Sequence, residues 1–302
     1  MRDVRVWLGP RAHPLLAEAI RRTGGTLVEP AEANVVVWHG WPPSRIREVL
    51  HSGIEWVQLD LTGIERWMEE GLIDGERRWT LVADVYAPDV ADHVVAFVLA
   101  AARRLAEAAR RTAWAPLAGE RLAGRTVGFV GGGAIAREAM VRLRPLGVRI
   151  LVLTRSGRSV AGADRSLRAG DLDELLIESD YAVLAAPLTP ETRGLIGGRE
   201  LDLLGPSGWL LNVARGALVQ TDALVRALAE GRIGGACLDV TDPEPLPEGH
   251  PLWRFRNVLV TPHAANPPGT TEEPLARLVE DNLRRFREGR DLRGLVDRER
   301  GY

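Results

Sequence analysis

Three polar residues in the C-terminal half of the sequence have the types needed to reduce a carbonyl group that lies next to a carboxylate. Arg215, Glu244 and His263 each follow, within a few residues, a short apolar run that is typical of a β-strand. An arginine can bind a carboxylate through its planar fork of N–H donors, and a histidine can exchange a proton near neutral pH. A glutamate beside the histidine favours the protonated imidazole. The set therefore indicates hydride transfer to a 2-keto acid, with the histidine moving the proton.

The absence of lysine removes several competing kinds of chemistry. All 39 basic residues are arginines, so the chain has no Schiff-base lysine and no Walker-A lysine. Arginine does not deprotonate in proteins, which leaves proton transfer to histidines and carboxylates. The single cysteine, Cys237, excludes an intramolecular disulfide and a cysteine-built metal cage. We expect no metal site.

Charge and hydropathy point to a small-molecule enzyme rather than a nucleic-acid or membrane protein. The formal net charge is only -2, with no basic excess of the kind that binds nucleic acid. The longest apolar run, residues 94–102, is too short to cross a bilayer. The first residues show no signal-peptide pattern, and a single cysteine suits a reducing compartment. We expect a cytoplasmic protein.

The chain alternates strand-like and helix-like segments, which predicts parallel sheets with right-handed crossovers. The strands predicted in the larger, later part are 127–130, 148–153, 181–185, 209–213, 236–240 and 258–260, with helices at 134–146, 172–178 and 221–230. The first third repeats the pattern with strands at 4–8, 35–38 and 56–59 and helices at 14–23 and 44–52. A long helix at 90–111 is expected to join two domains. An amphipathic helix at 274–288 is expected to pack back on the first.

A glycine-rich turn carries the pattern G-x-G-x-x-A directly after a predicted strand and before a predicted helix. Gly131 permits the tight turn, and Gly133 lets the backbone approach a pyrophosphate. Ala136 is small enough for close packing of helix on strand. The free N–H groups of Ala134 and Ile135 then face the phosphates at the positive end of the helix. This context predicts a dinucleotide-binding domain.

The next strand ends where an NAD-selective site normally places an acidic residue on the ribose 2′-hydroxyl. Here the chain has Thr154, Arg155, Ser156 and Arg158 instead. A carboxylate would repel a 2′-phosphate, whereas arginines attract it. The sequence therefore favours NADP(H), with NAD(H) still possible.

Taken together, these motifs resemble those of the D-isomer-specific 2-hydroxyacid dehydrogenase family, and are most similar to those of its glyoxylate/hydroxypyruvate reductases. The matching stretches are GFVGGGAIA (128–136), APLTPETRGLI (186–196), LLNVARGALV (210–219), CLDVTDPEPLPEGHPLW (237–253), LVTPHAA (259–265) and the tail LRGLVDRERGY (292–302). The resemblance implies a Rossmann-type doubly wound domain at 92–268 and a smaller flavodoxin-like substrate domain built from 1–91 and 269–302. It also implies an active site in the cleft between the domains, and a homodimer.

The family's catalytic roles can be carried over to matching positions. Arg215 matches the arginine that binds the substrate's carboxylate and keto oxygen, and His263 matches the proton donor and acceptor, with Glu244 as its partner. Asp239 matches the aspartate that orients the nicotinamide amide. The resemblance further assigns nicotinamide and ribose contacts to Pro187 and Val213, and substrate carboxylate binding to Thr62 and Gly63.

The sequence departs from the family around the expected substrate pocket. Relatives that act on phosphorylated substrates tend to carry a basic residue after the second strand, where this chain has Trp38 to Pro43. Trp38 and Trp41 could contact an uncharged or bulky substrate side chain, or could equally be core residues. The remaining histidines are interpreted as structural. They are His13, His39, His51, His93 and His250.

The function predicted first is an NADP(H)-dependent reductase of small 2-keto acids, glyoxylate or hydroxypyruvate in type, that acts on the CH–OH group in the reverse direction. A second hypothesis keeps the fold but pairs NAD(H) with a larger or aromatic 2-keto acid. A third, from another class, is a dinucleotide-sensing regulator in which catalysis is vestigial. Because a sensor has no need of a proton donor, the presence of Arg215, Glu244 and His263 together disfavours it.

Overall fold

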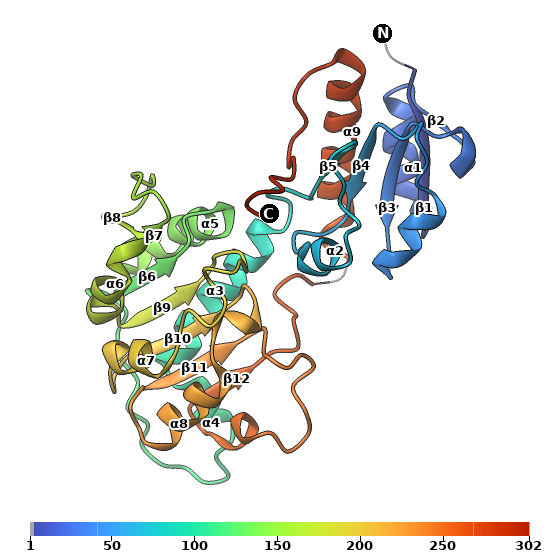
Figure 1. Cartoon of the computed structure of the whole chain (residues 1–302). Helices are drawn as coiled ribbons and strands as arrows, with labels where there is room; N and C mark the ends of the chain where they lie inside the picture. Colours follow the sequence, from blue (N-terminus) through green and yellow to red (C-terminus); the bar gives the residue numbers. More distant parts are fainter. Residues whose placement is uncertain (1–2, 41, 268, 302) are drawn as a thin grey trace. The chain divides into compact units, whose positions relative to one another are not determined.

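The computed structural model describes residues 3–40, 42–267 and 269–301, and the chain divides into two compact units (Figure 1). The first unit comprises Met1–Tyr86 and Pro267–Tyr302, and the second comprises Ala87–Asn266. The sequence placed these boundaries at 91/92 and 268/269. Within the described ranges, no helix is both long and apolar enough to cross a bilayer.

The first unit is built on a five-stranded parallel sheet in the order β2-β1-β3-β4-β5. The strands are β1 (Arg5–Pro10), β2 (Thr26–Leu27), β3 (Val35–His39), β4 (Trp56–Leu59) and β5 (Arg78–Thr80). This is the strand order of flavodoxin-like folds, and the predicted architecture of this domain is confirmed.

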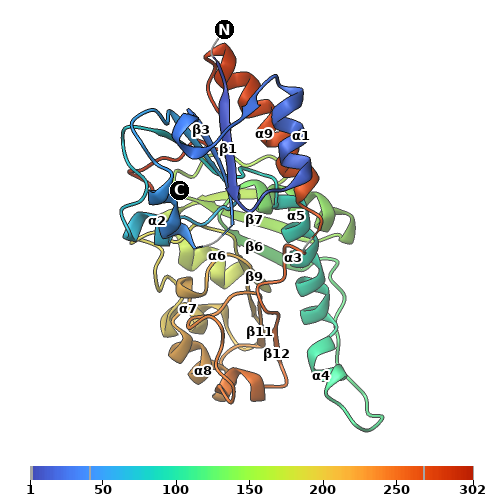
Figure 2. The same cartoon turned by 90° about the vertical axis from the view of Figure 1, so that its right-hand side faces the viewer.

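Both faces of that sheet are covered, as a parallel sheet requires. On one face, Val35 and Val37 pack in a cluster with the helices α1 (Pro14–Arg22) and α9 (Glu272–Glu288). On the other, Val36 and Trp38 pack with side chains from α2 (Glu65–Glu69) and the 3-10 helix η2 (Pro43–Glu48). Figures 1 and 2 both show α1 lying along α9. The prediction that the last helix packs on the first domain is therefore confirmed.

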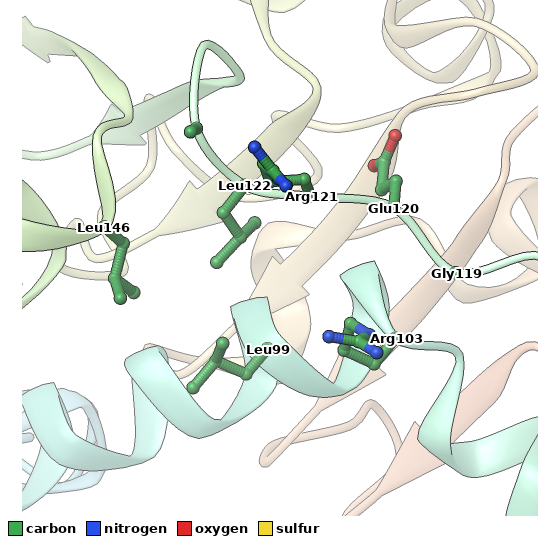
Figure 3. Close-up of a pocket in the computed structure, with 8 residues that line it drawn as sticks. Leu99, Arg103, Gly119, Glu120, Arg121, Leu122 and Leu146 are labelled. Carbon is green, nitrogen blue, oxygen red and sulfur yellow. The ribbon is translucent and has the colours of Figure 1, made fainter.

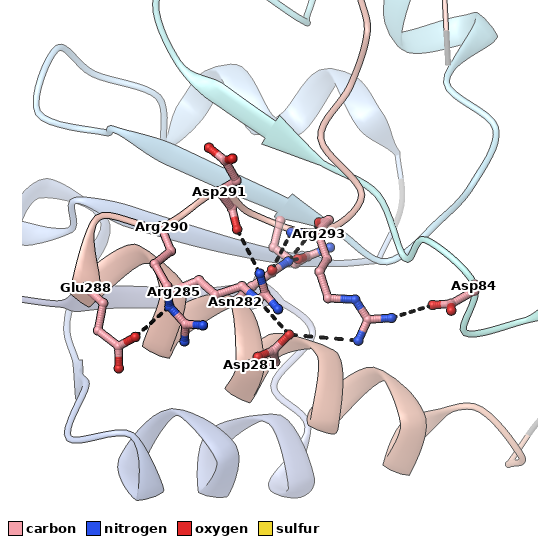
Figure 4. A network of polar contacts seen from close by, with 9 residues as sticks. Asp84, Asp281, Asn282, Arg285, Glu288, Arg290, Asp291 and Arg293 are labelled. Carbon is pink, nitrogen blue, oxygen red and sulfur yellow. Dashed lines mark hydrogen bonds and ion pairs between the residues drawn. The ribbon is translucent and has the colours of Figure 1, made fainter.

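A buried asparagine ties the C-terminal segment to α9. Asn282 is 0 % exposed, and its Nδ2 donates to Gln58 Oε1 at 2.9 Å and to the carbonyl of Arg293 at 3.0 Å. Its Oδ1 accepts the Arg293 N–H at 2.8 Å. Around it, Arg293 also pairs with Asp84 (Figure 4). Each buried donor or acceptor that is left without a hydrogen bond destabilises the fold by about 1 to 3 kcal/mol. Asn282 therefore fixes the path of the chain after α9.

The second unit is built on a seven-stranded parallel sheet in the order β12-β11-β10-β9-β6-β7-β8. The strands are β6 (Thr126–Val130), β7 (Arg149–Thr154), β8 (Arg165–Arg168), β9 (Tyr181–Leu184), β10 (Trp209–Asn212), β11 (Gly235–Leu238) and β12 (Val258–Val260). The order runs outward in both directions from β6, as in Rossmann-type sheets. The predicted doubly wound architecture is confirmed.

Helices cover both faces of this second sheet. One face carries α6 (Leu172–Glu178), α7 (Gly198–Leu204) and α8 (Thr221–Ala229), whose leucines share a core with the strands. The other carries α3 (Ala87–Ala102), which packs on α5 (Ala134–Leu143), β10 and β11, with α4 (Leu105–Ala109) against β12. The buried thiol of Cys237 lies on this second face, 3.8 Å from the carbonyl of Phe97. Burial raises the pKa of this thiol, which keeps it protonated and unreactive.

Two predicted helices were wrong in extent. The helix expected at 90–111 breaks after Ala102, where Arg104 adopts φ +50° and α4 begins. The cause is a tertiary contact. The N–H of Glu120 donates to the carbonyl of Ala102 at 2.8 Å, so a distant segment supplies the hydrogen bond at the end of the helix. The helix expected at 44–52 is the short 3-10 helix η2, which a hydrophobic pattern over so few residues cannot distinguish from an α-helix.

Candidate active site

The glycine-rich turn after β6 lies at the topological switch point of the second sheet. Because β6 is flanked by β7 on one side and β9 on the other, the connections leave it in opposite directions. Gly131 has φ +109°, and a Cβ there would lie 2.5 Å from the carbonyl oxygen of Ala185, directly after β9. Only glycine fits this close approach, and ligands of open α/β sheets bind at this point.

The same turn leaves space at the beginning of α5. Gly133 precedes α5, and a Cβ built on it meets nothing within 4 Å. Ala136 is 0 % exposed and packs the helix on the sheet. The first N–H groups of a helix, here those of Ala134 and Ile135, have no partner within the helix and attract anions. The geometry fits a pyrophosphate.

The residues that follow β7 fit the ribose end of a dinucleotide. Thr154 Oγ1 is buried and has no hydrogen-bond partner among the described residues, so a polar group of a ligand could complete it. Arg155 and Arg158 are exposed. The pKa of Glu191 is lowered, chiefly by the Thr189 hydrogen bond and also by the charge of Arg155. Arg155 thus lies near Glu191 in the loop after β9.

Arg215 follows β10 in a loop that presses against the loop carrying Glu244. Asn212, 1 % exposed, fixes this loop by donating to the Arg215 carbonyl at 2.9 Å and accepting from the Ala214 N–H at 3.1 Å. A Cβ on Gly216 would lie 2.0 Å from the backbone of Thr241. Because only glycine allows that contact, the arginine and glutamate loops are held side by side.

His263 and Glu244 form a direct pair at the same edge of the sheet. His263 Nδ1 lies 2.7 Å from Glu244 Oε1, and the second carboxylate oxygen accepts the Thr241 N–H at 3.3 Å. Both side chains are accessible, with 54 % and 41 % of their surfaces exposed. With Nδ1 bound to the carboxylate, Nε2 is the nitrogen left to exchange a proton with a ligand. This is the arrangement of an acid–base histidine with a carboxylate partner.

Asp239 lies beneath this pair and is 2 % exposed. Its Oδ1 accepts the hydroxyl of Thr261 at 2.6 Å and the N–H of Ala264 at 2.7 Å, while Oδ2 accepts the N–H of Ala265 at 3.1 Å. The sequence predicted a nicotinamide contact for Asp239. Since two carboxylate oxygens can accept about four hydrogen bonds, these three leave one acceptor position for such a contact.

The other predicted site residues lie at the carboxyl edges of the two sheets. Pro187 follows β9, and Val213, 7 % exposed, follows β10. Thr62 and Gly63 follow β4 and belong to the first unit. Trp38, 1 % exposed, donates from its indole N–H to the carbonyl of Gly40 and is a core residue of that unit. Trp41 lies outside the described residues.

The polar contacts of His93, a residue interpreted from the sequence as structural, were not predicted. This histidine lies on α3, yet its Nε2 is 3.0 Å from Thr261 Oγ1 and 3.6 Å from Asp239 Oδ1. The two contacts join positions about 150 residues apart or more, and no local pattern signals such a pairing. Only the packing of α3 against β11 brings them together.

A Rossmann-type sheet with a phosphate loop at its switch point, and a histidine–glutamate pair and an arginine at the same edge, defines a nicotinamide-dependent dehydrogenase. The comparisons with known proteins agree. Residues 95–265 match the family model "D-isomer specific 2-hydroxyacid dehydrogenase, NAD binding domain". The glyoxylate reductase of Thermococcus gammatolerans is 39 % identical over 232 residues, 73 % of this chain and 69 % of the relative. That of Thermococcus litoralis is 31 % identical over 313 residues, 98 % of this chain and 91 % of the relative.

Solved structures give the same result. A D-isomer specific 2-hydroxyacid dehydrogenase from Xanthobacter autotrophicus, in complex with NADPH, has a TM-score of 0.87 and 27 % identity over 99 % of each chain. An NADPH-dependent glyoxylate/hydroxypyruvate reductase from Sinorhizobium meliloti has a TM-score of 0.83 and 26 % identity over 99 % of this chain and 100 % of that one. The chain belongs to the D-isomer specific 2-hydroxyacid dehydrogenase family. It is an oxidoreductase that acts on a CH–OH group with a nicotinamide dinucleotide.

Proposed function

We propose that this dehydrogenase reduces small 2-keto acids, of the glyoxylate or hydroxypyruvate type, with NADPH, and forms the D-2-hydroxy acid where the product is chiral. The observation that carries the proposal is the His263–Glu244 pair at 2.7 Å, beside the loop of Arg215. The similar glyoxylate reductases and the NADPH-dependent reductase of known structure support the substrate and cofactor classes.

The reaction divides between the cofactor and the protein. Bound nicotinamide supplies the hydride that goes to the carbonyl carbon. The guanidinium of Arg215 binds the carboxylate and the keto oxygen and stabilises the negative charge that develops on that oxygen. His263, held by Glu244 through Nδ1, gives a proton from Nε2 to the same oxygen. The hydride and the proton together complete the two-electron reduction of the carbonyl group to an alcohol. In oxidation His263 is the base.

The remaining residues position the two ligands. The N–H groups of Ala134 and Ile135, made accessible by Gly131 and Gly133, hold the pyrophosphate. Pro187 and Val213 contact the nicotinamide and its ribose, and Asp239 orients the nicotinamide amide. The backbone N–H groups of Thr62 and Gly63 contribute to binding the substrate carboxylate.

NADP(H) preference follows from the residues after β7. Thr154, Arg155, Ser156 and Arg158 offer hydroxyl, backbone and guanidinium donors, and no carboxylate, to a 2′-phosphate. The buried Thr154 Oγ1, which has no hydrogen-bond partner in the described part of the chain, supports this use of the loop. An NAD(H)-selective enzyme normally has a carboxylate that accepts from the 2′-hydroxyl, and residues 154–158 contain none.

Charge removal in this loop tests the cofactor proposal. Replacing Arg155 and Arg158 by glutamine should lower kcat/KM for NADPH by about 10- to 100-fold for each charged hydrogen bond lost, and should leave kcat/KM for NADH within about twofold. Arg226→Gln, on α8, removes the same charge away from the loop and serves as the control. Equal losses with both cofactors would show that these arginines do not recognise the 2′-phosphate.

A panel of 2-keto acids, run with NADPH and with NADH, tests the proposed function as a whole. We expect glyoxylate and hydroxypyruvate with NADPH to give the highest kcat/KM. Preference for a phenyl-substituted keto acid with NADH would support the second hypothesis. Dinucleotide binding with no turnover on any keto acid would support a vestigial regulator and overturn the proposal.

We also propose that the protein is a cytoplasmic homodimer. Three large apolar side chains of one segment of the second unit are exposed: Leu99 at 38 %, Leu105 at 52 % and Trp114 at 104 %. Leu99 also lines a cavity of about 450 Å³, together with Leu122, Leu146, Arg103 and Arg121 (Figure 3). A second copy of the chain is the partner that the family resemblance implies, and light scattering of the intact protein measures this directly. The single buried thiol of Cys237 is compatible with a reducing compartment.

A further inference from the structure

His93 is linked to the loop of His263 by a chain of hydrogen bonds. Its imidazole, on α3, packs edge-on against Phe97 with ring centroids 4.3 Å apart. Its Nε2 lies 3.0 Å from the hydroxyl oxygen of Thr261, the first residue after β12. The same hydroxyl lies 2.6 Å from Asp239 Oδ1. Three side chains, one on α3 and two directly after β11 and β12, therefore meet next to the loop of His263.

The direction of these hydrogen bonds follows from the number of protons. A carboxylate only accepts, so the single hydroxyl proton of Thr261 goes to Asp239. The hydroxyl oxygen must then accept from His93, whose Nε2 carries a hydrogen. Burial lowers the pKa of His93, although the nearby Asp239 carboxylate opposes this shift. A neutral imidazole with its proton on Nε2 satisfies every one of these contacts.

Asp239 also holds the loop that carries His263. Its carboxylate accepts the N–H groups of Ala264 and Ala265, and its carbonyl accepts the N–H of His263 at 2.8 Å. His263 has φ +52°, in the left-handed region that a residue other than glycine rarely occupies. Such a conformation persists only where its surroundings hold it in several ways. Asp239 therefore holds the backbone around His263, and the hydrogen bond from Thr261 orients the Asp239 carboxylate.

We propose that His93 is a positioning residue for proton transfer, acting through Thr261 and Asp239 to hold His263 in its left-handed conformation. The inference rests on the proposed role of His263. In this role His93 contacts neither the substrate nor the reacting atoms. Its loss should displace the imidazole of His263 relative to the keto oxygen, and displacements of this kind lower kcat more than they weaken binding.

Two substitutions of similar polarity separate this role from packing. In His93→Gln the side-chain amide nitrogen can reach the place of Nε2 and donate to Thr261. In His93→Asn the amide is too short to do so. We expect His93→Asn to lower kcat by about 10- to 100-fold, with KM for glyoxylate and Kd for NADPH changed less than about threefold. His93→Gln should recover kcat to within about threefold of the wild type.

Val94→Ala is the matched control, because Val94 is a neighbour on α3 whose apolar side chain is fully buried. It should lower the melting temperature and leave kcat near the wild-type value. Thr261→Val interrupts the same chain at its next step. If His93 acts through Thr261, adding His93→Asn to Thr261→Val should lower kcat no further.

The outcomes separate this inference from the proposed function. If His263→Ala keeps its turnover, the proposed function fails whatever His93 does. If His263→Ala is inactive but His93→Asn keeps kcat within twofold of the wild type, the positioning role is wrong. It is also wrong if glutamine fails to restore what asparagine loses. Should His93→Asn not fold, Thr261→Val against Thr261→Ser gives the same comparison.

Discussion

Replacing His263 by alanine is expected to lower kcat for keto-acid reduction by about 10³-fold, within the range that positioned acids and bases contribute. KM for the keto acid should change little, because Arg215 makes the principal contacts to the carboxylate. The loss falls on kcat since the proton is needed only as charge develops on the keto oxygen. Steady-state kinetics with NADPH and glyoxylate measure both constants.

The carboxylate partner of His263 gives a second test of the same site. Glu244→Gln keeps a hydrogen-bonding group 2.7 Å from Nδ1 but removes the charge, and should give an intermediate kcat. His250→Asn, in the proline-rich loop, is the control. Turnover of His263→Ala near that of the wild type would show that the acid lies elsewhere.

The most reliable sequence patterns were those in which one residue type suits both the expected ligand and the backbone conformation at that position. Gly131 was predicted from the phosphate-loop pattern alone, and the structure gives the reason: a φ of +109° and a backbone approach that no side chain permits. The strand at 56–59 was predicted to the residue because the polar residues Glu55 and Asp60 flank it on either side. Signals of this kind are local, and one sequence is enough to read them.

What escaped the sequence depends on contacts between distant segments. The edge strand β8 (Arg165–Arg168) contains two arginines and a serine, and only its pairing with β7 makes it a strand. The end of α3 is set by Glu120, which lies beyond α4. The polar contacts of His93 could not be predicted for the same reason, since Asp239 and Thr261 lie directly after β11 and β12, far from α3 in the sequence. Such contacts depend on how distant segments pack, so no local pattern in the sequence predicts them.

Replacing Arg215 by lysine is expected to raise KM for the keto acid and lower kcat together, with kcat/KM falling by about 10- to 100-fold. Lysine keeps the positive charge but offers a point donor in place of the planar fork that binds two oxygens at once. Methionine, which removes the charge as well, should lower kcat/KM by about 10³-fold or more, since a donor to the developing oxyanion is lost with the carboxylate contact. The Kd for NADPH should remain near that of the wild type.

The contrast between Arg215 and His263 is what makes these two predictions informative. An arginine that binds the substrate before and during reaction affects KM and kcat, whereas a proton donor affects kcat alone. Arg226→Lys, on α8, is the matched control for the arginine variants. The double variant Arg215→Lys with His263→Ala should lose less than the product of the single effects, because both side chains act on the same oxygen. Strict multiplication of the two losses would mean that they act on separate steps, and that Arg215 binds the carboxylate without polarising the carbonyl.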